Sequence, residues 1–391
     1  MAIIERPIES VFRSCQRRLG PLLIVALSLA LLASAAQAQI ETAARAAIVI
    51  DVTGDAVLLE KNPDMAIPPA SMSKLMTVYM VFERLKQGKL SLDDLLPVSE
   101  RAWRMGGSKM FVDINSSVRV EDLLRGVIVQ SGNDACIVLA EGLAGSEEAF
   151  AEEMTKRGKE IGLRGSVFRN ASGWPQAEHV MTVRDLAVLA QRTIQDFPDY
   201  YHYYAERNFV FNKITQGNRN PLLYKNLGAD GLKTGHTDAA GYGLTGAALR
   251  DGRRIVLAVS GLANMRERAQ ETERLLEWAY REFAVTRLFK AGEAVESMPV
   301  WCGGAKTVPL TVAQDVAATL PKATRKDLKV VVAYDGPVAA PIKAGTRLAT
   351  LTVSAPGIPD RAVPLVAATE VASLGFFGRI AATVTHLMFG R

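Results

Sequence analysis

Cysteine is scarce in this sequence of 391 residues, which contains three. Cys15 precedes an apolar segment near the N-terminus, whereas Cys136 and Cys302 fall in segments that we assign below to different domains. A disulfide between these two is therefore not expected, and stability must come from a hydrophobic core. The four histidines are scattered, and no group of Cys, His and carboxylate residues has the spacing of a metal site. The sequence thus argues against a metalloenzyme, and we expect no cofactor.

The chain also lacks a strong excess of charge of either sign. Its formal net charge is +5, and the basic residues are interspersed with acidic ones, so we expect no nucleic-acid partner. Hydrophobic residues make up 49% of the sequence, which is enough to build a large core and excludes global disorder. The length suits two domains.

An apolar segment long enough to cross a membrane is missing near the N-terminus, where a shorter one occurs instead. Residues 22–32 are apolar, a basic segment precedes them, and the small residues Ala36 and Ala38 follow. This order is typical of a signal peptide. We predict that residues 1–38 form a signal peptide cleaved before Gln39. An uncleaved N-terminal anchor is the alternative.

Residues 39–285 combine strand and helix patterns in an order that predicts one α+β domain. Apolar, β-rich runs at 46–51 and 56–60 surround a turn sequence and predict a hairpin. A mostly helical middle follows, strand patterns return after Gly231, and a last helix is predicted at 271–283. We therefore expect an antiparallel sheet made from both ends of the segment, flanked by helices and interrupted by a helical insertion.

The composition changes again beyond this domain. In residues 286–367, short Val, Leu and Thr runs alternate with Gly and Pro, which predicts a small all-β domain. In residues 369–391, apolar residues recur at spacings of three and four, which predicts an amphipathic helix of about six turns. The adjacent Phe376 and Phe377 and a basic polar face favour binding to a membrane surface. Packing of the apolar stripe on the β domain is the alternative.

The first motif with chemical meaning, Ser71-Met72-Ser73-Lys74, opens a predicted helix. A serine there is usually only an N-cap. However, residues three apart share a helix face, so the amine of Lys74 can reach the hydroxyl of Ser71. A serine needs a base to become a nucleophile, and a lysine is a base only when its pKa falls below the usual value of about 10.4. The spacing therefore indicates a nucleophile and its base.

Two further motifs occur at separate places in the chain. Ser131-Gly132-Asn133 lies between two predicted helices, and Lys233-Thr234-Gly235-His236 lies on a predicted strand. Alone, the former reads as a capped helix break and the latter as a solvated strand end. Gly235 would let another backbone or a ligand lie close to that strand. All three motifs in this order and these contexts are far more specific than any one of them.

With these motifs the sequence resembles low-molecular-mass penicillin-binding proteins of the D-alanyl-D-alanine carboxypeptidase type, peptidase family S11. The resemblance rests on residues 69–74, 130–136 and 230–237 and covers nearly the whole predicted mature chain. It implies a β-lactamase/DD-peptidase-like catalytic domain, followed by the all-β domain and the terminal helix. It further implies that the protein removes the terminal D-alanine from peptidoglycan stem peptides ending in D-Ala-D-Ala and binds β-lactam antibiotics covalently. Its expected location is the periplasmic face of the bacterial inner membrane.

The resemblance assigns catalytic roles to three residues. Ser71 would attack the carbonyl of the penultimate D-alanine, and Lys74 would act as the general base. Ser131 would relay a proton toward the leaving amine. Backbone N–H groups of Ser71 and His236 would form the oxyanion hole.

The same resemblance implies the substrate-binding residues. Asn133 would hold the substrate amide. Lys233 would supply positive charge near Ser131 and the terminal carboxylate, and Thr234 would donate a hydrogen bond to that carboxylate. Gly235 and His236 complete the substrate-binding strand. Arg268 stands where the family has a carboxylate-binding arginine, although its neighbours depart from the family pattern. A surface arginine at a helix start is the alternative reading of this position, and for Arg219 we favour a structural role.

Other functions stay open from the sequence. A D,D-endopeptidase or a β-lactamase-like hydrolase would share the three motifs. The sequence lacks Glu-x-x-Leu-Asn, the motif that supplies the deacylating glutamate of class A β-lactamases. Deacylation of a penicilloyl adduct should therefore be slow, and penicillin should inhibit the protein. A non-catalytic scaffold protein of the same fold would be favoured by loss of Ser71, Lys74 or Lys233, and all three residues are present.

Overall fold

The structure, a computed structural model, describes residues 2–5, 40–356 and 360–389. The predicted signal peptide lies outside the described residues, apart from the short strand β1 (Ala2–Glu5). The chain forms two compact units, one spanning Glu41–Arg281 and the other containing β1 and the residues from Glu282 onward. Each unit is described by itself.

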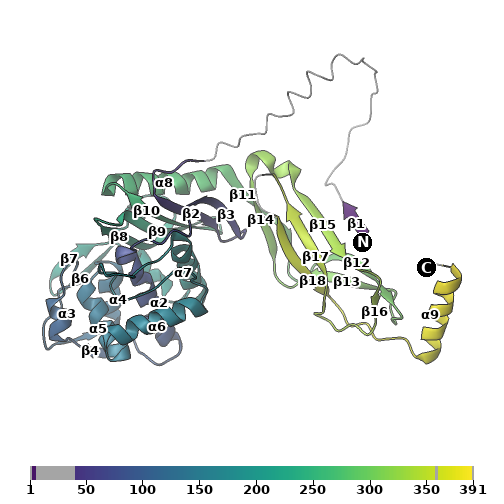
Figure 1. Cartoon of the computed structure of the whole chain (residues 1–391), viewed down its shortest axis with the longest axis horizontal. Coiled ribbons are helices and arrows are strands. Elements are labelled where there is room, and N and C mark those ends of the chain that lie inside the picture. Colours follow the sequence, from purple (N-terminus) through teal and green to yellow (C-terminus); the bar gives the residue numbers. More distant parts are fainter. Residues whose placement is uncertain (1, 6–39, 357–359, 390–391) are drawn as a thin grey trace, which may run out of the picture. The chain divides into compact units, whose positions relative to one another are not determined.

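The first unit is built on a five-stranded antiparallel sheet (Figure 1). The strand order is β3-β2-β10-β9-β8, so strands from both ends of the segment meet in one sheet. The turn between β9 and β10 places Asp251 and Gly252 at positive φ, as tight hairpins require. The strands are β2 (Ala46–Asp51), β3 (Ala56–Lys61), β8 (Ala229–Thr237), β9 (Gly241–Arg250) and β10 (Arg253–Leu262).

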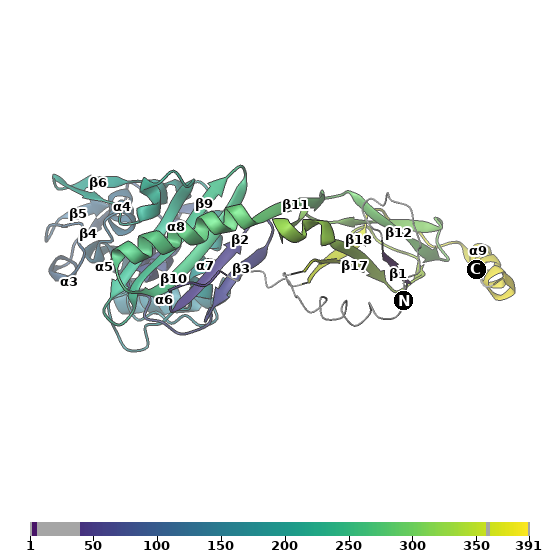
Figure 2. The same cartoon turned by 90° about the horizontal axis from the view of Figure 1, so that it is seen from above.

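Helices cover both faces of this sheet. The last helix, α8 (Met265–Glu282), crosses the strands on one face, and the helices of the inserted segment lie on the other (Figures 1 and 2). The inserted helices are α2 (Lys74–Lys86), α3 (Glu100–Arg104), α4 (Val120–Ile128), α5 (Asn133–Ala144), α6 (Glu147–Glu160) and α7 (Val183–Asp196). Two small two-stranded sheets complete the insertion. One pairs β4 (Leu95–Pro97) with β5 (Ser117–Arg119), and the other is a hairpin of β6 (Asn208–Phe211) and β7 (Ile214–Gly217).

The middle of this unit is the helix α2. Most of its 13 residues are buried, which agrees with a helix that is apolar on all sides. The helices around it begin where the sequence provides capping side chains: Ser146 accepts a hydrogen bond from the Ala149 amide, and Thr182 accepts one from the Asp185 amide. The helix α2 therefore runs through the hydrophobic core of this unit, and the residues that precede it start from that core.

The second unit is an all-β domain. A seven-stranded sheet has the order β1-β15-β17-β18-β13-β12-β16, and β11 pairs with β14. In β17 buried residues alternate with partly exposed ones, as expected for a strand with one face on a core. The strands are β11 (Phe283–Phe289), β12 (Ala294–Trp301), β13 (Thr307–Val312), β14 (Val316–Pro321), β15 (Lys329–Tyr334), β16 (Val338–Ala339), β17 (Arg347–Ser354) and β18 (Arg361–Ala367). The predicted fold class, an α+β catalytic-type domain with an all-β domain and a terminal helix, is confirmed.

Two predicted helix boundaries are wrong. The terminal helix α9 (Phe376–Phe389) does not begin at residue 369, because Val371 and Ser373 form β-bridges with Ile342 and Gly303. The helix α8 begins at Met265, six residues before the predicted start. Its first turn is polar and lacks the apolar spacing from which we predicted the start at 271. Among the residues that the structure describes, no helix is both long and apolar enough to cross a membrane.

Candidate active site

Ser71 lies in a 3-10 turn, Ala70–Ser73, that leads into α2. The sequence predicted an α-helix from this serine onward, whereas the first turn is 3-10 and the α-helix begins at Lys74. Ala70, which precedes the serine, has a positive φ of 49°. In a 3-10 turn, residues three apart eclipse one another, so Lys74 is still directed toward Ser71. The distance from Lys74 Nζ to Ser71 Oγ is 2.9 Å. The predicted nucleophile and base are therefore in hydrogen-bond contact.

Lys74 is completely buried and makes three hydrogen bonds. Its Nζ donates to Ser71 Oγ, to Asn133 Oδ1 at 2.8 Å and to the carbonyl oxygen of Ser172 at 2.6 Å. These three acceptors match the three hydrogens of an ammonium group. Burial lowers the pKa of Lys74 to about 8, with a smaller lowering from the positive charge of Arg219. A base that titrates near neutral pH suits general base catalysis.

Ser131 and Asn133 come from the junction of α4 and α5. Ser131 has a positive φ of 62°, an uncommon backbone conformation for a serine, and its buried Oγ has no hydrogen-bond partner in the described part of the chain. The amide of Asn133 is fully oriented, because Oδ1 accepts from Lys74 and Nδ2 donates to the Gly106 carbonyl at 2.9 Å. The structure thus brings the first two motifs together.

The buried carboxylate of Asp134 holds the loop beside this junction. It accepts hydrogen bonds from the backbone amides of Met110 and Phe111, both at 2.9 Å. The backbone N–H of Asn133 donates in turn to the Ser108 carbonyl at 2.7 Å. Residues 106–111 are therefore fixed against the start of α5.

The third motif lies on β8, next to the nucleophile turn. A Cβ atom on Gly235 would lie 2.9 Å from the Pro69 carbonyl oxygen, so only glycine allows this close approach. Lys233 and Thr234 are buried, and Lys233 Nζ donates to the Thr234 carbonyl rather than to Ser131. Burial lowers the pKa of Lys233 well below its usual value, and the charge of Lys74 adds to the effect. His236 is exposed and stacks on Tyr242 with ring centroids 3.9 Å apart.

Arg268 is only 7% exposed, so it is not a surface arginine. Its guanidinium lies 5.7 Å from the centre of the Tyr242 ring, and its Nε has no hydrogen-bond partner among the described residues. Burial lowers the pKa of Arg268. Arg268, Lys74 and Lys233 form no ion pair within the described part of the chain. An anionic group bound here would favour their charged forms, so the site has the electrostatics of a carboxylate-binding site.

Three groups near the cluster were missed or underrated from the sequence. The Ser172 carbonyl accepts from Lys74, and Arg219 Nη1 donates to Ser108 Oγ at 2.5 Å, beside the cluster. His179 Nε2 lies 2.8 Å from Ser73 Oγ, and its Nδ1 accepts from the Arg169 amide, so Nε2 carries the hydrogen. Burial lowers the pKa of His179 to about 4, which keeps the ring neutral. Only the turn-forming sequence around Ser172 hinted at this loop.

Cys136, close behind the second motif, is not a reactive thiolate. It is completely buried in α5, and burial raises its pKa to about 12. It therefore packs as a small apolar side chain.

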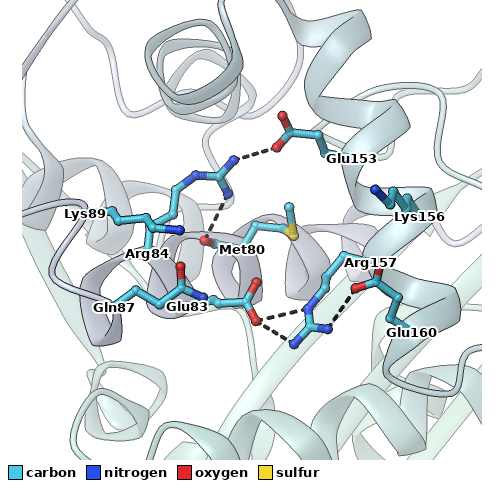
Figure 3. A pocket seen from close by; sticks show the side chains of 9 residues that line it. All are labelled: Met80, Glu83, Arg84, Gln87, Lys89, Glu153, Lys156, Arg157 and Glu160. Atoms are coloured by element: carbon cyan, nitrogen blue, oxygen red, sulfur yellow. Dashed lines mark hydrogen bonds and ion pairs between the residues drawn. The ribbon is translucent and has the colours of Figure 1, made fainter.

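A hollow of about 460 Å³ between α2 and α6 lies apart from this cluster (Figure 3). Both arginines in its lining are paired with carboxylates: Arg84 pairs with Glu153 at 2.5 Å, and Arg157 pairs with Glu83 at 2.6 Å. None of the predicted site residues lines it. The lining residues are Met80, Glu83, Arg84, Gln87, Lys89, Glu153, Lys156, Arg157 and Glu160.

Comparisons with known proteins agree with this arrangement. Residues 33–264 match the family model described as D-alanyl-D-alanine carboxypeptidase, peptidase S11, and residues 283–373 match that of the penicillin-binding protein 5 C-terminal domain. The D-alanyl-D-alanine carboxypeptidase DacA of Escherichia coli K12 is 37% identical over 341 residues, 85% of each chain. DacC of the same strain is 38% identical over 86% of each chain. The crystal structure of penicillin-binding protein 5 from Haemophilus influenzae is similar with a TM-score of 0.81 and 34% identity, covering 85% of this chain and 99% of that one.

Proposed function

The chain belongs to the D-alanyl-D-alanine carboxypeptidase family, peptidase S11, and from this membership we propose that it removes the terminal D-alanine from peptidoglycan stem peptides ending in D-Ala-D-Ala. It is a serine-type hydrolase of this family, whose members typically bind penicillin covalently. The observation that carries the assignment is the contact between Ser71 Oγ and the amine of Lys74, whose burial lowers its pKa to about 8.

The proposed reaction begins with acylation of Ser71. Neutral Lys74 takes the hydroxyl proton as Ser71 Oγ attacks the carbonyl carbon of the penultimate D-alanine. The backbone N–H groups of Ser71 and His236 stabilise the oxyanion. When the peptide bond breaks, the leaving D-alanine amine receives a proton through Ser131, whose Oγ has no other partner among the described residues. Water then cleaves the acyl-ester and restores Ser71.

The terminal carboxylate of the substrate is proposed to bind at the cationic side of the cluster. Thr234 donates a hydrogen bond to it, and Lys233 and Arg268 supply positive charge. The support is their burial without an ion pair in the described residues, because a buried cation gains most from an anionic ligand. Asn133 is proposed to hold the substrate amide on the other side of Ser71, and Gly235 lets the strand that carries Thr234 lie close to the nucleophile turn.

Intact-protein mass spectrometry with benzylpenicillin tests the nucleophile, beside a Ser71→Ala variant. We expect a long-lived adduct of one penicillin mass in the unaltered chain and none in the variant. Release of D-alanine from a peptide ending in D-Ala-D-Ala then tests the reaction. Rapid penicillin turnover would indicate a β-lactamase, cleavage of cross-linked dimers alone would indicate an endopeptidase, and no reaction would indicate a scaffold protein.

The terminal helix α9 is proposed to hold the protein at a membrane surface after export and removal of residues 1–38. The support is its exposed apolar stripe: Phe376 and Phe377 are 68% and 84% exposed, and Ile380 and Val384 lie on the same helix. Transfer of large apolar side chains from water into the interfacial region of a bilayer lowers the free energy of the system. The proposed location is the periplasmic face of the inner membrane.

Cosedimentation with anionic lipid vesicles tests the anchor. Replacing Phe376→Asp together with Phe377→Asp should abolish the binding, because both apolar area and attraction to anionic lipid are lost. A control protein carries the same added charge at two exposed positions of the β domain, Ala305→Asp with Ala344→Asp, and should still bind. Equal binding of both variants would exclude α9 as the anchor.

A further inference from the structure

Trp174 leaves much of its side chain in water beside the candidate active site: it is 46% exposed. Its backbone is nevertheless held firmly, because its N–H donates to Asn170 Oδ1 at 3.0 Å and its carbonyl accepts from Asn170 Nδ2 at 3.0 Å. The indole N–H makes no hydrogen bond within the described part of the chain. A fixed aromatic ring is thus presented to solvent, with a free donor at its edge.

The Trp174 ring lies against Gly106 and Gly107. A Cβ atom on Gly107 would be 2.9 Å from Trp174 Cζ3 and 2.8 Å from Asn133 Nδ2. Gly107 also has a φ of +73°, which favours glycine. Because both residues at this place lack side chains, no side chain from them stands between the ring and Asn133. The ring and the side chain of Asn133 therefore both lie beside Gly107, close to one another.

The loop that carries Trp174 is also fixed against the nucleophile turn. Ser172, two residues earlier, accepts the hydrogen bond from Lys74. Gly173 has a φ of +77° and lies so close to the turn that a Cβ atom on it would be 1.9 Å from the Ala70 carbonyl oxygen. The position of the ring relative to Ser71 is therefore set by packing and hydrogen bonds.

We infer that Trp174 is a specificity-determining contact for the residue that precedes D-Ala-D-Ala in the substrate. The inference rests on the proposed function. A peptide with its carboxylate at Thr234 and its reacting carbonyl at Ser71 must continue past Asn133, and its next side chain then reaches the indole ring. An exposed indole face binds methylene groups by burial of apolar surface and a terminal ammonium by cation–π attraction. The chemistry favours stem peptides whose third residue is a diamino acid with a long side chain.

The test compares kcat/KM for N-acetyl-L-lysyl-D-alanyl-D-alanine with that for the L-alanyl analogue. We expect the unaltered chain to prefer the lysyl peptide, Trp174→Ala to lower this preference about tenfold, and Trp174→Phe to retain most of it. Trp103→Ala removes a comparably exposed tryptophan, 41% exposed, from α3 and should leave the preference unchanged. Acylation by 6-aminopenicillanic acid, which has no acyl side chain to reach the ring, monitors the integrity of the reacting groups.

The inference is overturned if Trp174→Ala keeps the lysyl preference, or if it loses acylation by 6-aminopenicillanic acid in the same proportion as peptide turnover, since the role would then be structural. Failure of the inference can be told apart from failure of the proposed function. If the unaltered chain releases D-alanine from neither peptide, the proposed function fails. The inference is then decided by whether the lysyl peptide slows penicillin acylation more strongly than the alanyl peptide, and whether Trp174→Ala removes that difference.

Discussion

At the scale of single residues, the hydrogen bonds of Lys74 describe its resting state. Three acceptors surround its Nζ, and they are satisfied by the charged amine. Burial lowers its pKa to about 8, so at pH 7 roughly one molecule in ten holds the neutral amine that can accept a proton. The residue is thus poised between the form that the structure stabilises and the form that the reaction needs.

The rate of acylation should therefore depend on pH in a defined direction. Because the neutral amine is the active form, the second-order rate constant for benzylpenicillin should rise about tenfold per pH unit at low pH and level off above about 8. Two buried neighbours titrate outside this range, since the pKa of His179 is lowered to about 4 and that of Cys136 is raised to about 12. The pKa of Lys233 is lowered as well, so a Lys233→Arg variant is measured beside the unaltered chain to separate its titration from that of Lys74. Lys74→Arg, which keeps the charge, should lower the rate about 10²–10⁴-fold. Stopped-flow measurement of the acylation rate constant from pH 6 to 9.5 tests this dependence. A rate constant that does not change with pH would refute Lys74 as the base.

At the scale of elements, the site depends on how closely β8 approaches the turn before α2. Gly235 faces the Pro69 carbonyl and the side chain of Met72 across this contact. The sheet register pairs Gly235 with Gly243, which also lies against Met72. Two glycines facing one another across two strands therefore make the space into which the nucleophile turn is packed.

Gly235→Ala should consequently damage both stability and acylation. The added Cβ would lie 2.9 Å from a backbone oxygen, so the turn or the strand must shift. We expect a loss of about 1–3 kcal/mol in the free energy of unfolding and of about 10²-fold in penicillin acylation. Urea unfolding and the acylation rate are the measurements. Gly304→Ala, where the nearest atom would be 3.5 Å away, serves as the control and should change neither. Unchanged acylation in Gly235→Ala would mean that the close approach is not needed.

At the scale of the whole molecule, each compact unit has its own hydrophobic core. One core is built around α2 and the sheet of the first unit, and another lies within the β domain. All residues of the candidate site belong to the unit Glu41–Arg281. Ligand binding should therefore stabilise one unit and leave the other unaffected.

Differential scanning calorimetry of the full chain should show two transitions. Acylation by benzylpenicillin should raise the Tm of only one of them, by several degrees, because the acyl group binds the native state of that unit. The Ser71→Ala variant, which cannot be acylated, provides the control and should show no shift. A single transition that moves as a whole would contradict independent unfolding of the units.

The local pattern of the sequence was sufficient wherever neighbouring residues decide the structure. The hairpin at 46–51 and 56–60 and the strands near 329–334 and 347–354 follow from short apolar runs and turn residues. The contact between Ser71 and Lys74 follows from a spacing of three residues in one helical turn. These features depend on backbone geometry over a few residues.

Long-range packing decided the rest. The sequence could not show that the Ser172 carbonyl meets Lys74, that His179 meets Ser73 or that Arg268 is buried beside Tyr242, because each contact joins segments far apart in the chain. The start of α9 was missed for the same reason, since Val371 pairs with Ile342 on the β domain. Residue types and local spacing thus determined which groups could react. Burial and contacts between distant segments, which exist only in the folded protein, decided the pKa values and the hydrogen-bond partners of those groups.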